Sequence, residues 1–357
     1  MKRLTLGDVC KKASSNIAQK DLQDKMGVYP IYGASGLIKQ VDFYQQDKEY
    51  IAVVKDGAGI GRTMLLPAYS SVIGTMQYLL PKEGIPIDIK YLFYAVEHMN
   101  LAKYFSGATI PHIYFKDYQK EPINIPDIDT QRKISRIFDK IDTLVTSRKE
   151  QRTKLDQIVM SRFIEMFGDP VENPHGFRKV ALSELAEIKI GPFGSLLHKE
   201  DYIEGGHPLL NPSHIVDGKV APDSKLTISD KKYDELEAYH LHIGDVVMGR
   251  RGEMGRCAVV PSEGFLCGTG SLLIRTKGEV TADYIQKIIS FPSFRKTIED
   301  MAVGQTMLNL NVPIVSKFQI IKPPIEVQKN YYKFVAQTDK SKYRQEKCIG
   351  FFQCLEK

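Results

Sequence analysis

The sequence predicts a mixed α/β (α+β) protein made of two similar globular domains, joined by two long helices that form an antiparallel coiled coil. Three observations predict this fold. Short landmarks occur twice in the same order, glycine and proline turns break each half into short strands, and a heptad-like apolar period follows each half. The chain has 357 residues and is 43% hydrophobic, which is enough for two domains with separate cores.

The internal repeat consists of five pairs of short segments that keep their order along the chain. The two halves differ in length because the second half contains one insertion, residues 214–236. Chance similarity between apolar segments would not preserve five landmarks in order, so we expect both halves to have the same fold. The pairs are 4–9 with 180–185, 51–62 with 245–256, 74–75 with 268–269, 106–110 with 303–307, and 123–131 with 320–328.

Within each half, β-type runs come first and amphipathic helices follow. Residues 50–54 and 271–274 are apolar and bounded by turn residues, as expected for strands. Residues 90–96 and 284–289 have helical periodicity. Each half is therefore expected to be a mixed globule that leads into one long helix.

The apolar residues change to steps of three and four after Pro126 and again near the end of the chain. We predict a first domain at 1–127, a first helix at 128–168, a second domain at 169–324 and a second helix at 325–357. Gly168 and Pro170 are suited to end the first helix. The steps are interrupted near residues 148–152. The main positions are Ile134, Ile137, Ile141, Leu144 and Leu155 in the first helix, and Phe334, Thr338, Ile349 and Phe352 in the second.

A helix of about 35 residues spans roughly 50 Å, which is longer than a small globule. We therefore expect that neither helix can bury its stripe on its own globule, and that the two pair with each other. The alternative is two separate surface helices, each lying on its own domain.

Patterns of catalytic and metal-binding residues are missing from the sequence. The glycines of residues 57–61 precede no helix and no Gly-Lys-Ser/Thr, so we interpret them as a tight turn. Residues 173–176 and 211–214 lack the second proline and the aromatic of an amino-methyltransferase loop. Five scattered cysteines and eight histidines without HExxH spacing argue against disulfides and zinc. We expect no cofactor, no metal and no catalytic residue in this chain.

The charge balance permits a nucleic-acid partner without requiring one. Lys and Arg number 49 against 43 Asp and Glu. No apolar run approaches membrane-spanning length, so we expect a cytoplasmic protein. Side chains that can contact bases or phosphates gather at the glycine turns and in two polar loops, although an ordinary surface role is the alternative for each. These candidates are Arg62, Thr109, His112, Tyr114, Arg250, Arg251, Arg256, Gln305, Thr306 and Asn309.

The duplicated order of strand, glycine turn, Gly-x-Thr loop, Ile-x-x-Pro, Gln and long helix resembles the specificity subunits of type I restriction-modification systems. The stretches 106–134 and 304–328 resemble the family most. The resemblance implies that each domain recognises one half of a bipartite site in double-stranded DNA. It implies that the helices set the gap between the half-sites and dock two copies of an adenine methyltransferase subunit, with restriction subunits joining them. S-adenosylmethionine, ATP and Mg²⁺ would then bind to the partners.

Three alternatives stay open at this point. One is the separate specificity chain of a fused methyltransferase-nuclease, which the neighbouring genes would distinguish. A second is an independent methyltransferase or nuclease, and a third is a structural spacer that does not bind DNA.

Overall fold

The structure is a computed structural model that describes residues 2–107, 110–302 and 309–355. The chain divides into two compact units. Unit 1 comprises Met1–Gln151 and Gln345–Lys357, and unit 2 comprises Arg152–Arg344. Each unit therefore contains one globule and a part of both long helices, α4 (Ile128–Phe167) and α10 (Ile325–Leu355). The two predicted long helices are thus confirmed.

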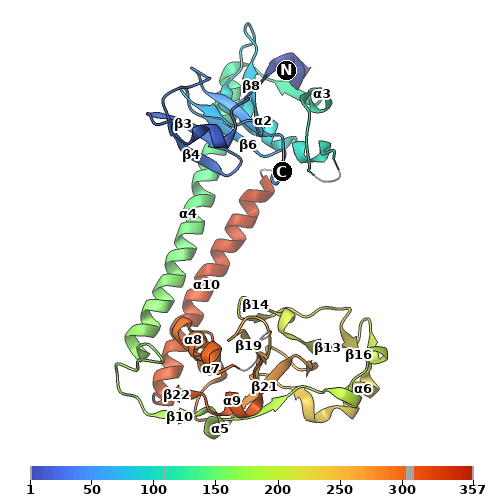
Figure 1. The fold of residues 1–357 in the computed structure, drawn as a ribbon, viewed down its shortest axis with the longest axis vertical. Helices are drawn as coiled ribbons and strands as arrows, with labels where there is room; N and C mark the ends of the chain where they lie inside the picture. The colour runs from blue at the N-terminus through green and yellow to red at the C-terminus, as the bar shows by residue number, and fades with distance from the viewer. Residues whose placement is uncertain (1, 108–109, 303–308, 356–357) are drawn as a thin grey trace. The chain divides into compact units, whose positions relative to one another are not determined.

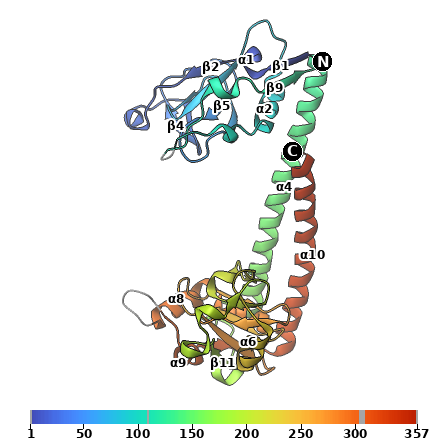
Figure 2. The ribbon, with the colours of Figure 1, turned by 90° about the vertical axis from the view of Figure 1, so that its right-hand side faces the viewer.

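In unit 1 a four-stranded antiparallel sheet has the strand order β2-β8-β5-β6, and a smaller sheet has the order β4-β3-β7 (Figure 1). Strands β1 and β9 pair with each other and close the globule beside the start of α4 (Figure 2). The strands are β1 (Lys2–Thr5), β2 (Cys10–Ser14), β3 (Tyr29–Gly33), β4 (Gly36–Val41), β5 (Tyr50–Val54), β6 (Thr63–Leu66), β7 (Ser71–Val72), β8 (Met76–Pro81) and β9 (Pro122–Ile125). The helices of the globule are α1 (Leu6–Val9), α2 (Ile89–His98), α3 (Phe115–Tyr118) and the 3-10 turn η2 (Leu101–Tyr104).

The alternation of side chains along β5 explains how this globule forms its core. Ile51 and Val53 point to the same side as Leu92 and Val96 of α2. The intervening residues point to the other face, where they pack with β7 and β8. Because all five residues of β5 are buried, the strand is apolar on both faces, as the run 50–54 indicates.

Unit 2 repeats this plan. Its four-stranded sheet has the order β11-β21-β18-β19, which matches β2-β8-β5-β6 strand for strand, and β10 pairs with β22 as β1 pairs with β9. The strands are β10 (Lys179–Ala181), β11 (Ala186–Ile190), β12 (Tyr202–Ile203), β13 (His207–Leu210), β14 (Ile215–Val216), β15 (Lys219–Val220), β16 (Thr227–Ile228), β17 (His240–Leu241), β18 (Val246–Gly249), β19 (Cys257–Val259), β20 (Phe265–Cys267), β21 (Ser271–Thr276) and β22 (Gln319–Ile321). The helices are α5 (Leu182–Leu185), α6 (Asp230–Glu235), α7 (Ala282–Ile289), α8 (Pro292–Met301) and α9 (Val312–Ser316).

The second sheet of unit 2 is larger than its counterpart in unit 1. It has five strands in the order β12-β16-β13-β20-β17, whereas unit 1 has three. The parallel pair β13–β20 corresponds to the parallel pair β3–β7. The predicted insertion, residues 214–236, forms the hairpin β14–β15, strand β16 and helix α6. The extra sequence therefore extends a peripheral sheet and leaves the central one unchanged.

The helices join the globules more closely than the sequence indicates. Phe163 and Phe167 of α4 are fully buried in the main core of unit 2, where both rings contact Tyr284 and Tyr331. The end of α4 therefore packs on the globule that follows it in the chain, a contact that the expectation about its own globule did not include. The aromatic surface that receives it is formed by Tyr284 of α7 and Tyr331 of α10.

In unit 2 the two long helices also pack against each other in antiparallel fashion. The Tyr331 hydroxyl donates to the Val159 carbonyl at 3.2 Å, and Lys342 Nζ lies 2.6 Å from Asp156 Oδ1. Residue numbers thus rise along α10 as they fall along α4, which is the predicted direction. No helix within the described ranges is long and apolar enough to cross a membrane.

Candidate nucleic-acid interface

Turn A, defined as residues 55–62, connects β5 to β6 in unit 1. The Val54 amide donates to the Arg62 carbonyl at 2.9 Å, and the Gly61 amide donates to the Val54 carbonyl at 2.8 Å. Gly61 has a φ of +78°, and a Cβ there would lie 2.3 Å from the Ala102 nitrogen. The glycine is therefore required both by its conformation and by the close approach of η2.

Loop A, defined as residues 105–107 and 110–114, lies directly on turn A. The Gly57 amide donates to the Pro111 carbonyl, and the Ile113 amide donates to the Lys55 carbonyl, both at 2.9 Å. Asp56 and His112 form an isolated antiparallel bridge. The predicted candidate loop and the glycine turn thus form one surface, although they are about fifty residues apart in sequence.

His112 is oriented by a carboxylate that the sequence analysis did not identify. Its Nδ1 lies 2.6 Å from Asp56 Oδ1, and Lys55 Nζ lies 3.4 Å from the other carboxylate oxygen. Because an ionised carboxylate can only accept, Nδ1 carries the proton and Nε2 is left for another partner. The Tyr114 ring lies 5.2 Å from the imidazole and is 46% exposed. No sequence signal links residue 56 to residue 112, because only the folded loop brings them together.

Turn B, residues 250–256, contacts Asn309 and Leu310 in unit 2, as turn A contacts His112 and Ile113 in unit 1. The Leu310 amide donates to the Arg250 carbonyl at 2.9 Å, as the Ile113 amide does to Lys55. Arg251 and Asn309 form a bridge at the position of Asp56 and His112. The Arg251 side chain is exposed. Arg250 Nε donates back to the Leu310 carbonyl at 3.1 Å, and burial, followed by the charge of Arg251, lowers the pKa of Arg250.

Arg62 and Arg256 occupy equivalent positions at the ends of the two turns, and both bind the protein itself. Arg62 Nη1 donates to the Ala34 carbonyl at 2.9 Å. Arg256 Nη2 donates to Glu253 at 2.7 Å and its Nη1 donates to a backbone carbonyl. Glu253 also pairs with Arg295 of α8, and the hydrogen bond from Arg256 is the main cause of its lowered pKa. Arg256 therefore binds the protein itself and shares the carboxylate of Glu253 with Arg295.

Three of the predicted DNA-binding candidates, Thr109, Gln305 and Thr306, lie outside the described residues. The Lys55 amide donates to the Thr75 carbonyl and the Arg250 amide donates to the Gly270 carbonyl. The structure therefore aligns Thr75 with Gly270, one residue later than the pairing of 74–75 with 268–269. Among the described residues, no group of His, Cys, Asp and Glu side chains is placed to hold a metal ion.

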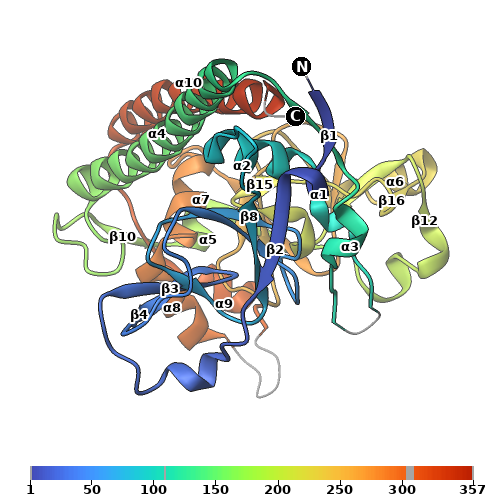
Figure 3. The same ribbon diagram turned by 90° about the horizontal axis from the view of Figure 1, so that it is seen from above.

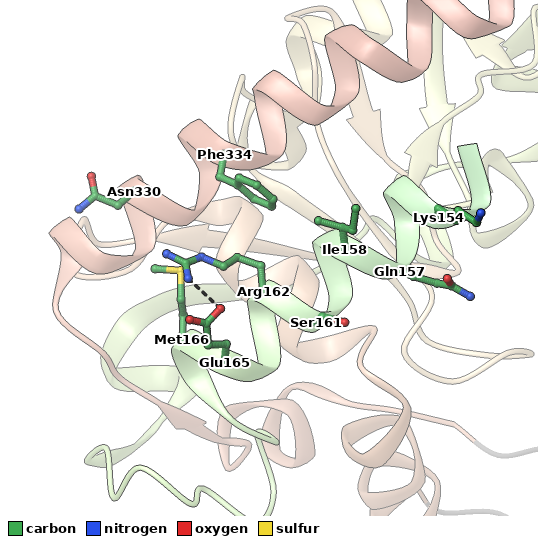
Figure 4. Close-up of a pocket in the computed structure, with 9 residues that line it drawn as sticks. All are labelled: Lys154, Gln157, Ile158, Ser161, Arg162, Glu165, Met166, Asn330 and Phe334. Carbon is green, nitrogen blue, oxygen red and sulfur yellow. Dashed lines mark ion pairs between the residues drawn. The ribbon is translucent and has the colours of Figure 1, made fainter. Parts of the chain in front are cut away.

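A groove between α4 and α10 in unit 2 is the second candidate site. It has a volume of about 840 Å³, and Ile158 of α4 and Phe334 of α10 line it from opposite sides (Figure 4). Ile158 is 50% exposed. Arg162 and Glu165 form an ion pair at 2.7 Å along its α4 side. The other lining residues are Lys154, Gln157, Ser161, Met166 and Asn330.

The predicted positions of the helical seam have unequal exposure. Ile137 and Leu144 are 57% and 42% exposed, whereas Thr338 is 7% exposed. The others are half-buried, namely Ile134, Ile141, Leu155, Phe334, Ile349 and Phe352. Thr338 is therefore the most buried of these predicted positions.

Two globules with the same sheet plan and equivalent glycine turns, together with two long helices, define a class of internally duplicated proteins. The comparisons place the chain within that class. Residues 1–157 and 174–348 match the family model of the type I restriction modification DNA specificity domain, and the chain belongs to this family.

Individual relatives agree with the family model. The chain is 28% identical over 155 residues to the specificity subunit of type I restriction enzyme EcoprrI of Escherichia coli, which covers 42% of this chain and 38% of that subunit. It is 19% identical over 297 residues to the MjaVIII specificity subunit of Methanocaldococcus jannaschii, covering 78% and 69%.

Solved structures show the same fold. The S subunit of a type I restriction-modification system from M. genitalium matches with a TM-score of 0.59 at 15% identity, covering 99% of this chain and 93% of that one. A chain from a study of complex assembly and conformational transition of the type I R-M system matches with a TM-score of 0.63 at 14% identity, covering 99% and 95%.

Proposed function

We propose that this chain is the sequence-reading subunit of a type I restriction-modification complex. Each globule recognises one half of a bipartite site in double-stranded DNA through its loop and turn. The observation that carries the proposal is that the turns after β5 and β18, equivalent strands of the two sheets, bridge to equivalent residues, His112 and Asn309, with different polar side chains at the two places. Equivalent frames with different side chains are what two readers of different half-sites require.

We further propose which partner subunits this chain binds and which subunits bind the cofactors. The long helices dock two copies of an adenine methyltransferase subunit, and restriction subunits join this assembly. S-adenosylmethionine, ATP and Mg²⁺ bind to those partners, and the chain itself is not catalytic. Supporting this, the groove between α4 and α10 presents apolar and charged side chains together, as a groove for a partner helix does.

A domain exchange tests whether each globule recognises its half of the site independently. The junction should follow Ile125, because β9 then stays with its partner β1. Residues 1–125 of a related subunit replace those of this chain, a methyltransferase partner is co-expressed, and methylated sites are sequenced. Only one half of the site should change, and a change in both halves would contradict independent reading. Methyl transfer by the purified chain alone would contradict the non-catalytic role.

The two arginine environments give a sharper test of the interface. Arg251→Ala removes an exposed cation, so binding to DNA should weaken. If the contact is to a phosphate, the slope of log affinity against log salt should fall by about one. If it is to a base, one position of the site should relax at a cost of about 1–3 kcal/mol.

Arg256→Ala is the matched control, because this charge is paired with Glu253. Its effect should appear in stability more than in the salt slope. An unchanged affinity and site preference in Arg251→Ala would remove that residue from the interface.

A further inference from the structure

The most buried polar side chains of the long helices are two glutamines at equivalent positions. Gln131 and Gln328 are each the fourth residue of their helix, and both have an exposed fraction of 0%. A buried amide is stable only if its donors and acceptor are satisfied. Their partners therefore show what these two side chains hold in place.

Gln131 connects three segments of unit 1. Its Oε1 accepts a hydrogen bond from the Asp88 amide at 2.8 Å, and its Nε2 donates to the carbonyls of Pro86 at 3.1 Å and Pro126 at 2.9 Å. Asp88 is the N-cap of α2. One side chain of α4 thus holds the start of α2, the segment before it and the residue that follows β9. Ser135, one turn later, donates to Asp88 Oδ1 at 2.8 Å.

Gln328 makes the same connection in unit 2. Its Oε1 accepts from the Thr281 amide at 3.0 Å, and its Nε2 donates to the Pro323 carbonyl at 3.0 Å. Thr281 is the N-cap of α7. The Tyr284 hydroxyl donates to the Ile321 carbonyl, as the Tyr91 hydroxyl does to Asn124. The arrangement is therefore part of the repeat.

The chemistry resembles a capping box formed between two helices. In an ordinary capping box, Glu or Gln at the third helical position accepts from the N-cap amide of its own helix. That position is Tyr91 in α2 and Tyr284 in α7, which cannot do so. The long helix supplies the missing acceptor instead. The contact between α2 and α4 continues beyond this hydrogen bond. The Tyr94 ring of α2 stacks on Phe138, and Lys90 pairs with Asp139. The ribbons of α2 and α4 are neighbours in Figure 3.

We propose that Gln131 and Gln328 are positioning residues that fix the direction in which each long helix leaves its globule. We call the contact between the start of each long helix and its globule the joint. Through the joint, the two glutamines hold each DNA-reading surface in a set orientation to the helix that follows it. The functional consequence rests on the function proposed above, whereas the fixed direction of the helix does not. Two experiments therefore separate the two claims.

The first experiment measures the joint directly in the full-length chain. Spin labels are placed at the exposed positions Glu83 and Thr146, which belong to the globule and the helix of unit 1. Cys348 and Cys354 are changed to Ser for this purpose. Gln131→Met keeps the length of the side chain but removes all three hydrogen bonds. The distribution of label distances should become about twofold broader, because a local connection that limits opening is lost.

Gln77→Met is the matched control. Gln77 is 3% exposed, lies in β8 of the same globule, and donates to the Tyr118 hydroxyl away from the joint. It should lower stability to a similar extent and leave the distance distribution unchanged. If the two variants gave the same width, Gln131 would be only a stabilising residue and the proposal would be overturned.

Ser135→Ala covers the case in which Gln131→Met does not fold. Ser135 is 3% exposed, and the change removes one bond of the same joint without adding volume. It should broaden the same distribution by a smaller amount. An unchanged width in this variant would also overturn the proposal.

The second experiment measures the consequence by sequencing methylated sites in cells that contain a methyltransferase partner. Gln131→Met should leave both half-site sequences unchanged but allow gaps one base pair longer or shorter, since one base pair spans only about 3.4 Å. Gln77→Met should keep the parental gap. A parental gap in Gln131→Met would overturn the role of the joint in spacing. No methylation by the parental chain would instead contradict the proposed function and leave the distance measurement to decide the joint.

Discussion

At the scale of single residues, two glycines of turn A distinguish the cost of backbone strain from the cost of a steric clash. Gly57 and Gly61 both have positive φ, at +85° and +78°, but only Gly61 has a neighbour within 4 Å of a built Cβ. Gly61→Ala should therefore cost about 2–4 kcal/mol, from backbone strain and displacement of η2, whereas Gly57→Ala should cost about 1 kcal/mol from strain alone. Urea unfolding monitored by circular dichroism measures both. Equal costs would show that η2 moves away without resistance.

The buried cysteines give a second prediction at this scale. Burial raises the pKa of Cys10, Cys257 and Cys267 to about 12, and the nucleophile is the thiolate. At pH 8 roughly one thiol in ten thousand would be ionised, so these residues should resist iodoacetamide in the native chain and react once it unfolds. Peptide mapping after timed alkylation measures this. Native-state labelling of Cys257 would show that unit 2 opens locally.

At the scale of elements, the groove between α4 and α10 allows a paired test of partner docking. Ile158 lines the groove and is 50% exposed, whereas Ile164 is 48% exposed and does not line it. Either change to Glu should alter stability by less than about 0.5 kcal/mol, because both sites are exposed. Ile158→Glu should weaken co-purification of the methyltransferase at least about tenfold, a typical loss for an interface centre. Similar losses in both variants would place docking elsewhere.

The sequence predicted elements better than contacts between them. The heptad-like period marks α4 and α10 because packing of an amphipathic helix leaves its period in the sequence. It could not show that Phe163 and Phe167 pack on the globule of unit 2, since the period only says which face is buried. The sequence marked Gln131 and Gln328 as a repeated landmark, but it could not show what Gln131 contacts, because its partners Pro86 and Asp88 are about forty residues away. Likewise Asp56 is found only once the loop is folded.

At the scale of the whole molecule, the division into units shows where each long helix passes from one unit to the other. Unit 1 contains the start of α4 and the end of α10, and unit 2 contains the remainder of both. Both helices therefore pass from one unit to the other, between Gln151 and Arg152 and between Arg344 and Gln345. One insertion at each of these two points therefore adds the same length to both helices.

We predict that one heptad inserted after Gln151 and another after Arg344 will lengthen the gap between half-sites by about three base pairs. Seven residues add about 10 Å and preserve the apolar seam. Each added base pair also rotates the next half-site by about 35°, since a turn of DNA holds 10–10.5 base pairs, so methylation should be slower. A heptad in α4 alone should abolish activity or keep the old gap with α4 bulged. Mapping methylated sites with the methyltransferase partner present distinguishes these results. If the paired insertion retained the parental gap at full activity, the helices would not set the spacing.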